Sequence, residues 1–390
     1  MVHSHRNVFL LAACQALAMT SMTIMITVAS LTGRMLAEDD SFATLPLAFQ
    51  YLATWLTTIP ASTLMRRIGR RAGFSIGASL GVTGAGLIAL AVIDLSFWLM
   101  CLGNMLVGVC MGFCLFFRFA AADAADERFR AKAISWVVSG GVFAALVGPE
   151  LARHTRDLLG GYLYAGGFVA IMALFGTCLV LVQFVRIPLP PAYVTQAGGR
   201  PLREIVVQPA FIVAVLSGMV AYGVMNFIMV ATPFAVEDCG LGADATPGVI
   251  RLHALGMFAP AFFTGHLINK FGVRRVLVAG ALTLAGAIGV DLAGVTLAHF
   301  WIGLFLLGLG WNCLFVGGST LLTQTYRPEE RSKMQGINDF FVFGTVACTS
   351  FSSGWVYGGY GWSVANAAGI PLIAISLFAI AWLIWRGGDR

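Results

Sequence analysis

The amino-acid sequence predicts an all-α integral membrane protein with twelve transmembrane helices in two six-helix bundles. Three observations lead to this fold class. The chain is 58% hydrophobic and only 11% charged, whereas a soluble domain carries about 25% charged residues. Apolar stretches of about 20 residues, the length needed to span a bilayer, recur along the chain. Lys and Arg gather in alternate loops between these stretches, as expected for a polytopic membrane protein.

The apolar stretches define the predicted spans one by one. Each is bounded by polar, Gly-rich or Pro-rich residues that end a hydrophobic helix. The twelve predicted spans are 7–33, 43–65, 72–93, 97–121, 133–152, 159–185, 206–236, 247–268, 275–296, 298–324, 334–357 and 361–385.

Loop charge predicts the orientation of the spans. If both termini are cytoplasmic, the cytoplasmic segments hold 19 of the 24 Lys and Arg residues. This asymmetry follows the positive-inside rule and predicts an even number of spans with both termini cytoplasmic. We expect a multi-pass protein of the inner membrane. The net charge of +6 then reflects loops that face the anionic lipid surface, and no nucleic-acid partner is needed to explain it.

Several other functions are not expected from the sequence. Seven of the eight cysteines fall in predicted spans and only Cys239 in an outside loop, so we expect no structural disulfide. There is no phosphate-binding loop of the G-x-x-x-x-G-K-[ST] type and no nucleophilic constellation. The chain is therefore not expected to be an enzyme or to need a cofactor.

The chain divides into two halves that resemble each other. A polar, Pro-rich and Gly-rich linker, 187–205, separates an N-terminal six-helix bundle, 1–186, from a C-terminal one, 206–390. Matching residues recur at a single offset of 203, which indicates an internal duplication. The matching pairs are Gly69 with Gly272, Gly77 with Gly280, and Glu127 with Glu330.

The short basic loops after spans two and eight carry a family resemblance. The first reads Leu-Met-Arg-Arg-Ile-Gly-Arg-Arg and ends at Arg71, and its counterpart lies around Gly272. Together with Gly148-Pro149 in span five, these loops resemble the signature motifs of the major facilitator superfamily. That resemblance implies two bundles that rock about a midplane site. The usual acidic position of the loop is Arg66 in the first copy and Asn269 in the second, so the family's ion pair from this position is not expected.

Two residue pairs in spans seven and eight suggest a soft metal site. Met225 and Met229 are four residues apart, as are His253 and Met257, so each pair shares one face of a helix. If the two faces met, three thioethers and one imidazole would form an uncharged ligand set suited to Cu(I). Methionine is also an ordinary gap-filler of apolar cores, whereas a histidine inside a span is usually functional.

The same two motifs resemble those of the CcoA-like copper importers, a bacterial branch of the superfamily. This resemblance implies that Met225, Met229, His253 and Met257 bind copper as the transported substrate. It also implies import from periplasm to cytoplasm and delivery to a cytoplasmic acceptor for cytochrome oxidase assembly. The branch contains relatives implicated in riboflavin uptake, so membership alone leaves the substrate open.

Other candidate residues lie elsewhere in the spans. Cys110 and Cys114 form a third soft pair with i,i+4 spacing that could pass on a metal, although buried cysteines are more often small hydrophobes. Arg118, Glu150 and Asp339 are charged positions that could couple or gate transport, or could form structural ion pairs.

Two alternatives to copper import remain open. An organic solute such as riboflavin would need stacking and hydrogen-bonding groups, and the spans offer them at Tyr222, Asn226, Trp311, Asn312 and Trp136. A copper-binding sensor or assembly partner would bind the metal without concentrating it in the cell.

Overall fold

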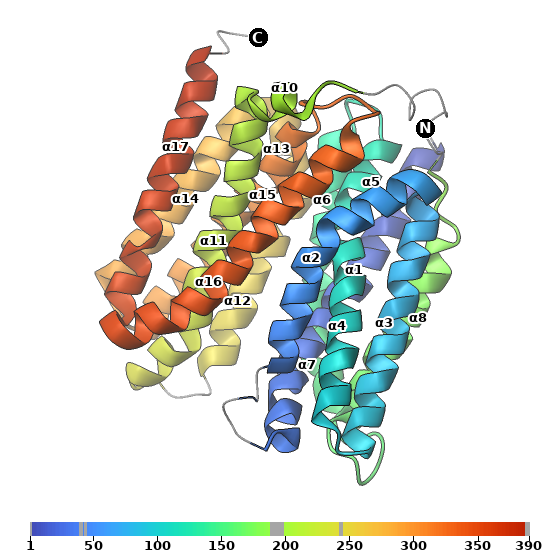
Figure 1. Ribbon diagram of the computed structural model, residues 1–390. Coiled ribbons are helices and arrows are strands. Elements are labelled where there is room, and N and C mark those ends of the chain that lie inside the picture. Colours follow the sequence, from blue (N-terminus) through green and yellow to red (C-terminus); the bar gives the residue numbers. More distant parts are fainter. Residues whose placement is uncertain (1, 39–41, 43–44, 188–198, 242–244, 387–390) are drawn as a thin grey trace. The chain divides into compact units, whose positions relative to one another are not determined.

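The computed structural model consists of helices and their connecting turns over the residues it describes, which are 2–38, 42, 45–187, 199–241 and 245–386 (Figure 1). These described residues contain no β-strand. Helices are the expected solution because a bilayer offers no partners for unsatisfied backbone groups. The predicted linker 187–205 falls largely outside the described residues.

The chain forms two compact units. The first contains residues 1–125 and 140–189. In it, α3 packs on α4 and α8, α2 packs on α4, and α1 packs on α7 and α8. Its helices are α1 (Val2–Leu36), α2 (Leu45–Ile68), α3 (Arg70–Ile93), α4 (Phe97–Cys114), α5 (Phe117–Ala124), α7 (Gly141–Thr155) and α8 (Ala165–Val182).

The second unit contains residues 126–139 and 190–390. Its central helix is α15, which packs on α11, α12 and α14. Helix α16 packs along α11, and α17 packs on α11 and α14. The helices of this unit are α6 (Arg130–Ser139), α10 (Leu202–Val206), α11 (Pro209–Asp238), α12 (Thr246–Phe258), α13 (Ala261–Phe271), α14 (Val273–Ala293), α15 (Leu297–Leu322), α16 (Arg331–Ala367) and α17 (Gly369–Arg386).

Nine helical stretches of the described chain are long and apolar enough to cross a membrane. They correspond to all the predicted spans except 43–65, 247–268 and 334–357, which lie in α2, α12 with α13, and α16. These three segments carry more polar side chains, and polar residues in spanning helices usually serve structure or function. Helix α16 runs through two predicted spans, and its backbone breaks at Gly361, which has φ 77°.

The compact units differ from the predicted halves at one segment. The sequence places 126–139 in the first half, but this segment belongs to the second compact unit. The reason is that α6 packs on α13 and α15, and that the Asn269 side chain donates a hydrogen bond to the Arg128 carbonyl at 2.7 Å.

The two basic loops share one backbone geometry. Gly69 precedes α3 with φ 90° and ψ 162°, and Gly272 precedes α14 with φ 86° and ψ 150°. Positive φ of this kind is readily adopted only by glycine. The offset of 203 therefore relates positions that share an unusual conformation as well as a residue type.

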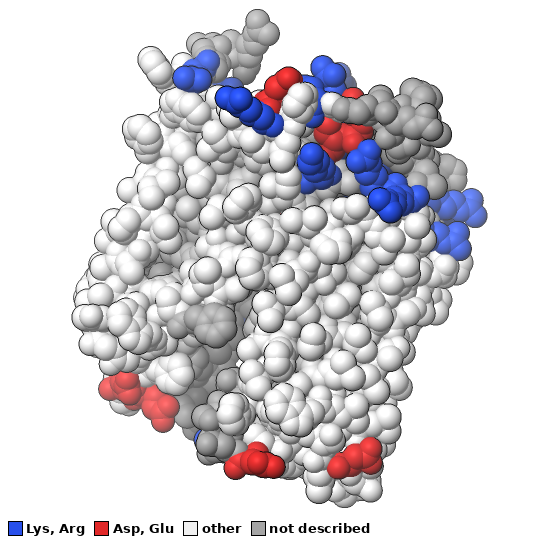
Figure 2. Space-filling view, viewed as in Figure 1, with Lys and Arg blue, Asp and Glu red and all other residues white. Residues whose placement is uncertain are grey.

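Charge is unevenly distributed over the second unit. Figure 2 shows basic side chains over the end of this unit that carries α10, and acidic side chains at its opposite end. The positive-inside rule predicts that the basic end faces the cytoplasm.

Close backbone packing fixes α12 against α15. A Cβ atom at Gly308 would lie 2.5 Å from the His253 carbonyl oxygen and 2.7 Å from the Met257 nitrogen. On the facing helix, a Cβ atom at Gly256 would lie 2.5 Å from the Phe305 carbonyl oxygen. Glycine at both positions lets the two backbones meet, as small residues do between membrane helices.

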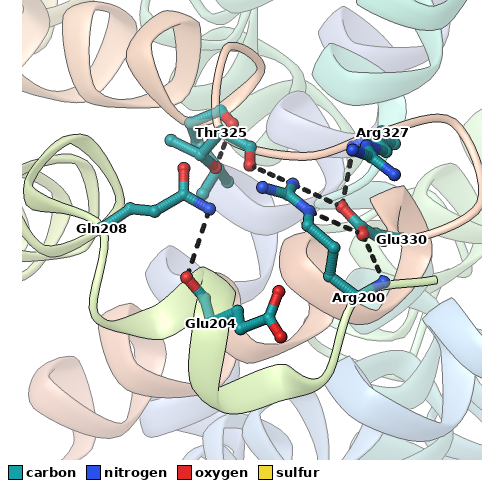
Figure 3. A network of polar contacts seen from close by, with 7 residues as sticks. Arg200, Glu204, Gln208, Thr325, Arg327 and Glu330 are labelled. Carbon is teal, nitrogen blue, oxygen red and sulfur yellow. Dashed lines mark hydrogen bonds and ion pairs between the residues drawn. The ribbon is translucent and has the colours of Figure 1, made fainter.

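A buried carboxylate ties the end of the linker to the loop before α16 (Figure 3). The Arg200 guanidinium donates to both oxygens of Glu330, at 3.0 and 2.7 Å, and its backbone N–H donates at 2.7 Å. The backbone N–H of Arg327 adds another bond at 2.9 Å. These donors, the Arg200 side chain first among them, lower the pKa of Glu330 from 4.5 to about 2.

Replacing Gly308 with alanine should destabilise the protein. Because the new methyl group would meet backbone atoms that cannot rotate away, we expect a loss of about 1–3 kcal/mol, as for overpacked cores. The measurement is the apparent melting temperature of the detergent-purified protein. The matched control is Gly286→Ala on α14, where a Cβ atom meets nothing within 4 Å. Equal melting temperatures for the two variants would contradict the packing described here.

The Glu330→Gln variant should show a pH-dependent loss of stability. The pKa of Glu330 is lower in the folded protein than its ordinary value of 4.5. Its contribution to stability is therefore complete above about pH 4.5 and disappears as the pH falls toward about 2. We expect the melting temperature to be lower than wild type at pH 7, with the difference shrinking on acidification. A difference that is constant with pH would show that the carboxylate charge is not responsible.

Candidate substrate site

The eighth predicted span is broken next to the predicted metal ligands. Helix α12 ends at Phe258 and α13 begins at Ala261, with Pro260 between them. Proline has no N–H and disrupts the helical ladder. The Met257 carbonyl accepts a hydrogen bond from the Asn312 side chain of α15 at 2.6 Å, and the Thr264 hydroxyl donates to the Asn312 amide oxygen at 2.6 Å.

A serine of α6 supports the first turn of α13. The Ser135 hydroxyl donates to the Ala261 carbonyl and accepts from the Gly265 N–H, the latter at 2.9 Å. It thus stands between two backbone groups that would otherwise bond to each other in the helix. Ser135 is fully buried. Sequence reasoning missed both Ser135 and Thr264, because each acts on a segment distant along the chain.

His253 presents one free lone pair inside the second unit. Its side chain is 2% exposed, and Nδ1 lies 2.7 Å from the Leu304 carbonyl oxygen. Since a carbonyl oxygen only accepts, Nδ1 carries the proton and Nε2 is left as an acceptor. Nε2 has no hydrogen-bond partner among the described residues. This is the tautomer in which a neutral histidine binds a metal or accepts a hydrogen bond.

The three methionines lie on α11 and α12. Met225 and Met257 are buried and Met229 is half-buried. Helix α15 packs closely on both α11 and α12, whereas α11 and α12 contact each other only slightly. The convergence of Met225, Met229, His253 and Met257 on one point stays a prediction. Within the described residues, no group of three or more His, Cys, Asp or Glu side chains could hold a metal ion.

An aromatic cluster surrounds Tyr222 of α11. Its ring lies 5.2 Å from Trp311, 5.0 Å from Phe315 and 5.1 Å from Phe343, measured between centroids. Trp311 stacks on Phe315 at 4.9 Å and meets the edge of Phe258 at 5.7 Å. Trp311 is 1% exposed, and its indole Nε1–H has no acceptor among the described residues.

The other residues proposed to bind an organic solute already make contacts within the protein. The Asn226 amide donates to Ser350 at 2.8 Å and to Thr349 at 3.1 Å, which ties α11 to α16. Trp136 meets the Phe129 ring edge-on at 5.4 Å. Asn312 uses both ends of its amide in the break of span eight. Asn312 therefore has a structural role whichever substrate is carried.

The predicted cysteine pair lies in the first unit. The sulfur atoms of Cys110 and Cys114 are 4.0 Å apart, and both residues are buried. A second thiol pair, formed by Cys14 of α1 and Cys178 of α8, lies near them. A metal role for Cys110 and Cys114 stays a prediction.

The three charged candidates occupy different environments. Arg118 is buried on α5, donates to the Leu115 carbonyl at 2.6 Å and lies 4.3 Å from the centre of the Phe119 ring. Glu150 is exposed and pairs with Arg153 at 2.9 Å. Asp339 is fully buried on α16 and accepts a hydrogen bond from Asn338 at 2.9 Å. A solvated pair such as Glu150 with Arg153 contributes little to stability.

Sequence comparison establishes the family. The Major Facilitator Superfamily model matches residues 11–260 and again 216–389. The chain belongs to the major facilitator superfamily. The resemblance seen in the basic loops is thus confirmed, and so are the all-helical fold and the multi-pass membrane character. The protein is a secondary transporter and not an enzyme.

Two individual relatives match most of the chain. The riboflavin transporter RfnT of Brucella anthropi is 38% identical over 378 residues, covering 96% of this chain and 94% of its own. An uncharacterised transporter of the superfamily from Bacillus subtilis, YddS, is 28% identical and covers 93% of this chain and 87% of its own. The name of the first relative refers to riboflavin, the second is uncharacterised, and neither name refers to copper.

Solved structures of low sequence identity confirm the fold. The human organic anion transporter MFSD10 matches with a TM-score of 0.78 at 13% identity, covering 97% of this chain and 99% of its own. The transporter FucP in its outward conformation matches with a TM-score of 0.76 at 15% identity, covering 96% and 98%.

Replacing Asn312 with leucine should destabilise the protein independently of substrate. The change leaves the Met257 carbonyl without its donor, and an unpaired buried polar group costs about 1–3 kcal/mol. We expect a lower melting temperature in the absence of any substrate. An unchanged melting temperature with lost transport would instead assign Asn312 to the substrate.

Proposed function

We propose that this transporter imports riboflavin or a closely related flat heteroaromatic solute into the cytoplasm. The observation that carries the proposal is the 38% identity, over 96% of the chain, to a protein named as a riboflavin transporter. A match of this length includes both halves, and in this fold the substrate site is built from both.

The aromatic cluster around Tyr222 supplies suitable chemistry. Flat heteroaromatic rings bind by stacking on aromatic side chains, with a few polar groups that fix their orientation. Tyr222 is half-buried; it packs in T-shaped contacts with Trp311 and Phe315 and in a tilted contact with Phe343. Preorganised rings lose little freedom when a ligand stacks on them. The unpartnered Nε1–H of Trp311 is a donor of the kind that a ring carbonyl would accept.

Copper import is the second candidate. The observation that favours it is His253, whose Nε2 lone pair is buried and lacks a partner among the described residues. With thioethers from Met225, Met229 and Met257 it would make a neutral, soft ligand set for Cu(I). The same lone pair could accept a hydrogen bond from an imide N–H of an organic ring, so His253 serves either proposal.

Uptake in cells separates the two candidates. Cells that lack riboflavin synthesis and riboflavin uptake would express the chain, and radiolabelled riboflavin accumulation would be measured. In parallel, radioactive copper uptake would be measured in cells without a copper importer. We expect riboflavin uptake and no copper uptake above background. Copper uptake alone, lost when Met225, Met229 and Met257 are changed to Leu and His253 to Ala, would overturn the riboflavin proposal.

Replacing Tyr222 with alanine should lower riboflavin uptake. Stacking on an aromatic side chain is worth about 1–3 kcal/mol per ring, so we expect a loss of roughly tenfold or more in uptake efficiency. The matched control is Phe234→Ala on the same helix, since Phe234 is 54% exposed. Membrane abundance of both variants would be compared on immunoblots. Equal uptake by the two variants would exclude Tyr222 from the site.

A further inference from the structure

Asp291 is a buried acid near the end of α14 that the proposed substrate site does not use. The residue is 2% exposed, and in the described part of the protein neither of its carboxyl oxygens has a hydrogen-bond partner. A Cβ atom at Gly303 of α15 would collide with Asp291 Oδ1. The carboxyl therefore lies directly against the neighbouring helix, in space that a glycine leaves open.

The first half of the chain fills the equivalent space with an apolar side chain. Ile88 of α3 lies 203 residues before Asp291, at the offset that relates the two halves, and it is fully buried. A Cβ atom at Gly103 of α4 would lie 2.6 Å from the Ile88 Cγ1 atom, so a glycine of the next helix faces this position too. Because isoleucine satisfies the packing, a carboxyl is not needed to fill the space.

The helices packed on α14 bring no positive charge to this carboxyl. They are α13, α15, α16 and α17. The sequence has no Lys or Arg in residues 276–326 or 334–385, which include all of α15, most of α16 and α17 up to its last residue. On α14 itself, Arg275 is 16 residues away, or about 24 Å along the helix. A counter-charge for Asp291 must therefore come from outside these helices.

The other titratable groups on these helices are engaged, exposed or distant. On α15, Nδ1 of His299 lies 2.7 Å from the Thr296 hydroxyl. On α16, the Tyr357 hydroxyl donates to Asp238 at 2.6 Å, and Tyr360 is 61% exposed. The remaining groups lie about 15 Å or more from the level of Asp291, at 1.5 Å per residue; they are Cys313, Asp339, Cys348, His266 and Lys270.

Asp291 lies at the end of α14 that the positive-inside rule places toward the outside, opposite the basic loop at Gly272. Other buried polar groups occur at this end. Trp362 of α16 packs against Phe300 of α15 at 5.2 Å, one helical turn before Gly303. Its Nε1–H has no acceptor among the described residues. The outer end of the unit is thus more polar than its packing requires.

A carboxyl in this position is suited to carry a proton. An ionised carboxylate without a partner is costly to bury, and ionisable residues inside membrane spans are usually functional. We propose that Asp291 is a proton-binding site in exchange with the outer solution and that its proton regulates import. The neutral form lets α14 rest on α15, whereas the ionised form needs hydration that this contact excludes. A proton needs one oxygen, while cations such as Ca²⁺ take six or more.

Infrared spectroscopy of the purified protein tests the proton site without any transported substrate. Ordinary Asp and Glu side chains are ionised at neutral pH, so the carbonyl stretch of a protonated carboxyl reports an unusual acid. We expect this band in the wild type at neutral pH and its loss at alkaline pH. The band should be absent from Asp291→Asn and from Asp291→Ile, which places the residue of the first half at this position.

The matched control is Glu150→Gln, which removes an exposed carboxyl and should keep the band. Melting temperature supplies a second readout. It should fall with rising pH in the wild type relative to Asp291→Asn, because the folded wild type must keep a proton that the unfolded chain gives up. No band in the wild type, a band that persists at alkaline pH, or equal bands in wild type and both Asp291 variants would overturn the proposal.

Regulation of import is tested by uptake, and this step rests on the proposed function. Riboflavin uptake should depend on external pH in the wild type and lose that dependence in Asp291→Asn. An equal dependence in both would show that this proton does not regulate import. Absence of riboflavin uptake by the wild type would reject the riboflavin proposal, and the infrared result would still decide on Asp291. Stabilisation by sodium chloride over potassium chloride, lost in Asp291→Asn, would replace the proton with a metal cation.

Discussion

The arrangement of the second unit depends on satisfying the backbone where span eight breaks. A bilayer supplies no water to pair with exposed carbonyl and N–H groups, and Pro260 interrupts the ladder between α12 and α13. Asn312 donates to the Met257 carbonyl, and Ser135 bridges Ala261 and Gly265. These contacts come from α15 and α6, so the break also dictates which helices must be neighbours.

The same constraint positions the candidate substrate groups. Because Gly308 allows the α12 backbone to rest on α15, His253 reaches the Leu304 carbonyl and is fixed in one tautomer. Two and three helical turns beyond Leu304 on α15, Trp311 and Phe315 pack against Tyr222 of α11. Helix α15 therefore contacts both His253 of α12 and Tyr222 of α11, so it positions the polar group and the stacking group together.

Much of the fold could be predicted from the sequence because each membrane span is a continuous run of apolar residues. The broken span was not predicted, since the side chains that satisfy it, Asn312 and Ser135, are distant in the sequence. The motif around Met225 and His253 was recognisable as a pattern. Its meaning depends on which faces of α11 and α12 point together, and i,i+4 spacing fixes only a shared face within one helix. Local patterns likewise could not show that the Asn312 side chain donates a hydrogen bond to the Met257 carbonyl.

The assignment of residues 126–139 to the second unit has a mechanical consequence. The chain passes between units at 125–126, at 139–140 and at 189–190, so three covalent strands join them where a simple tandem duplication would leave one. The middle junction falls between Ser139 and Gly140, inside the predicted span 133–152. A single predicted span thus contributes residues to both compact units.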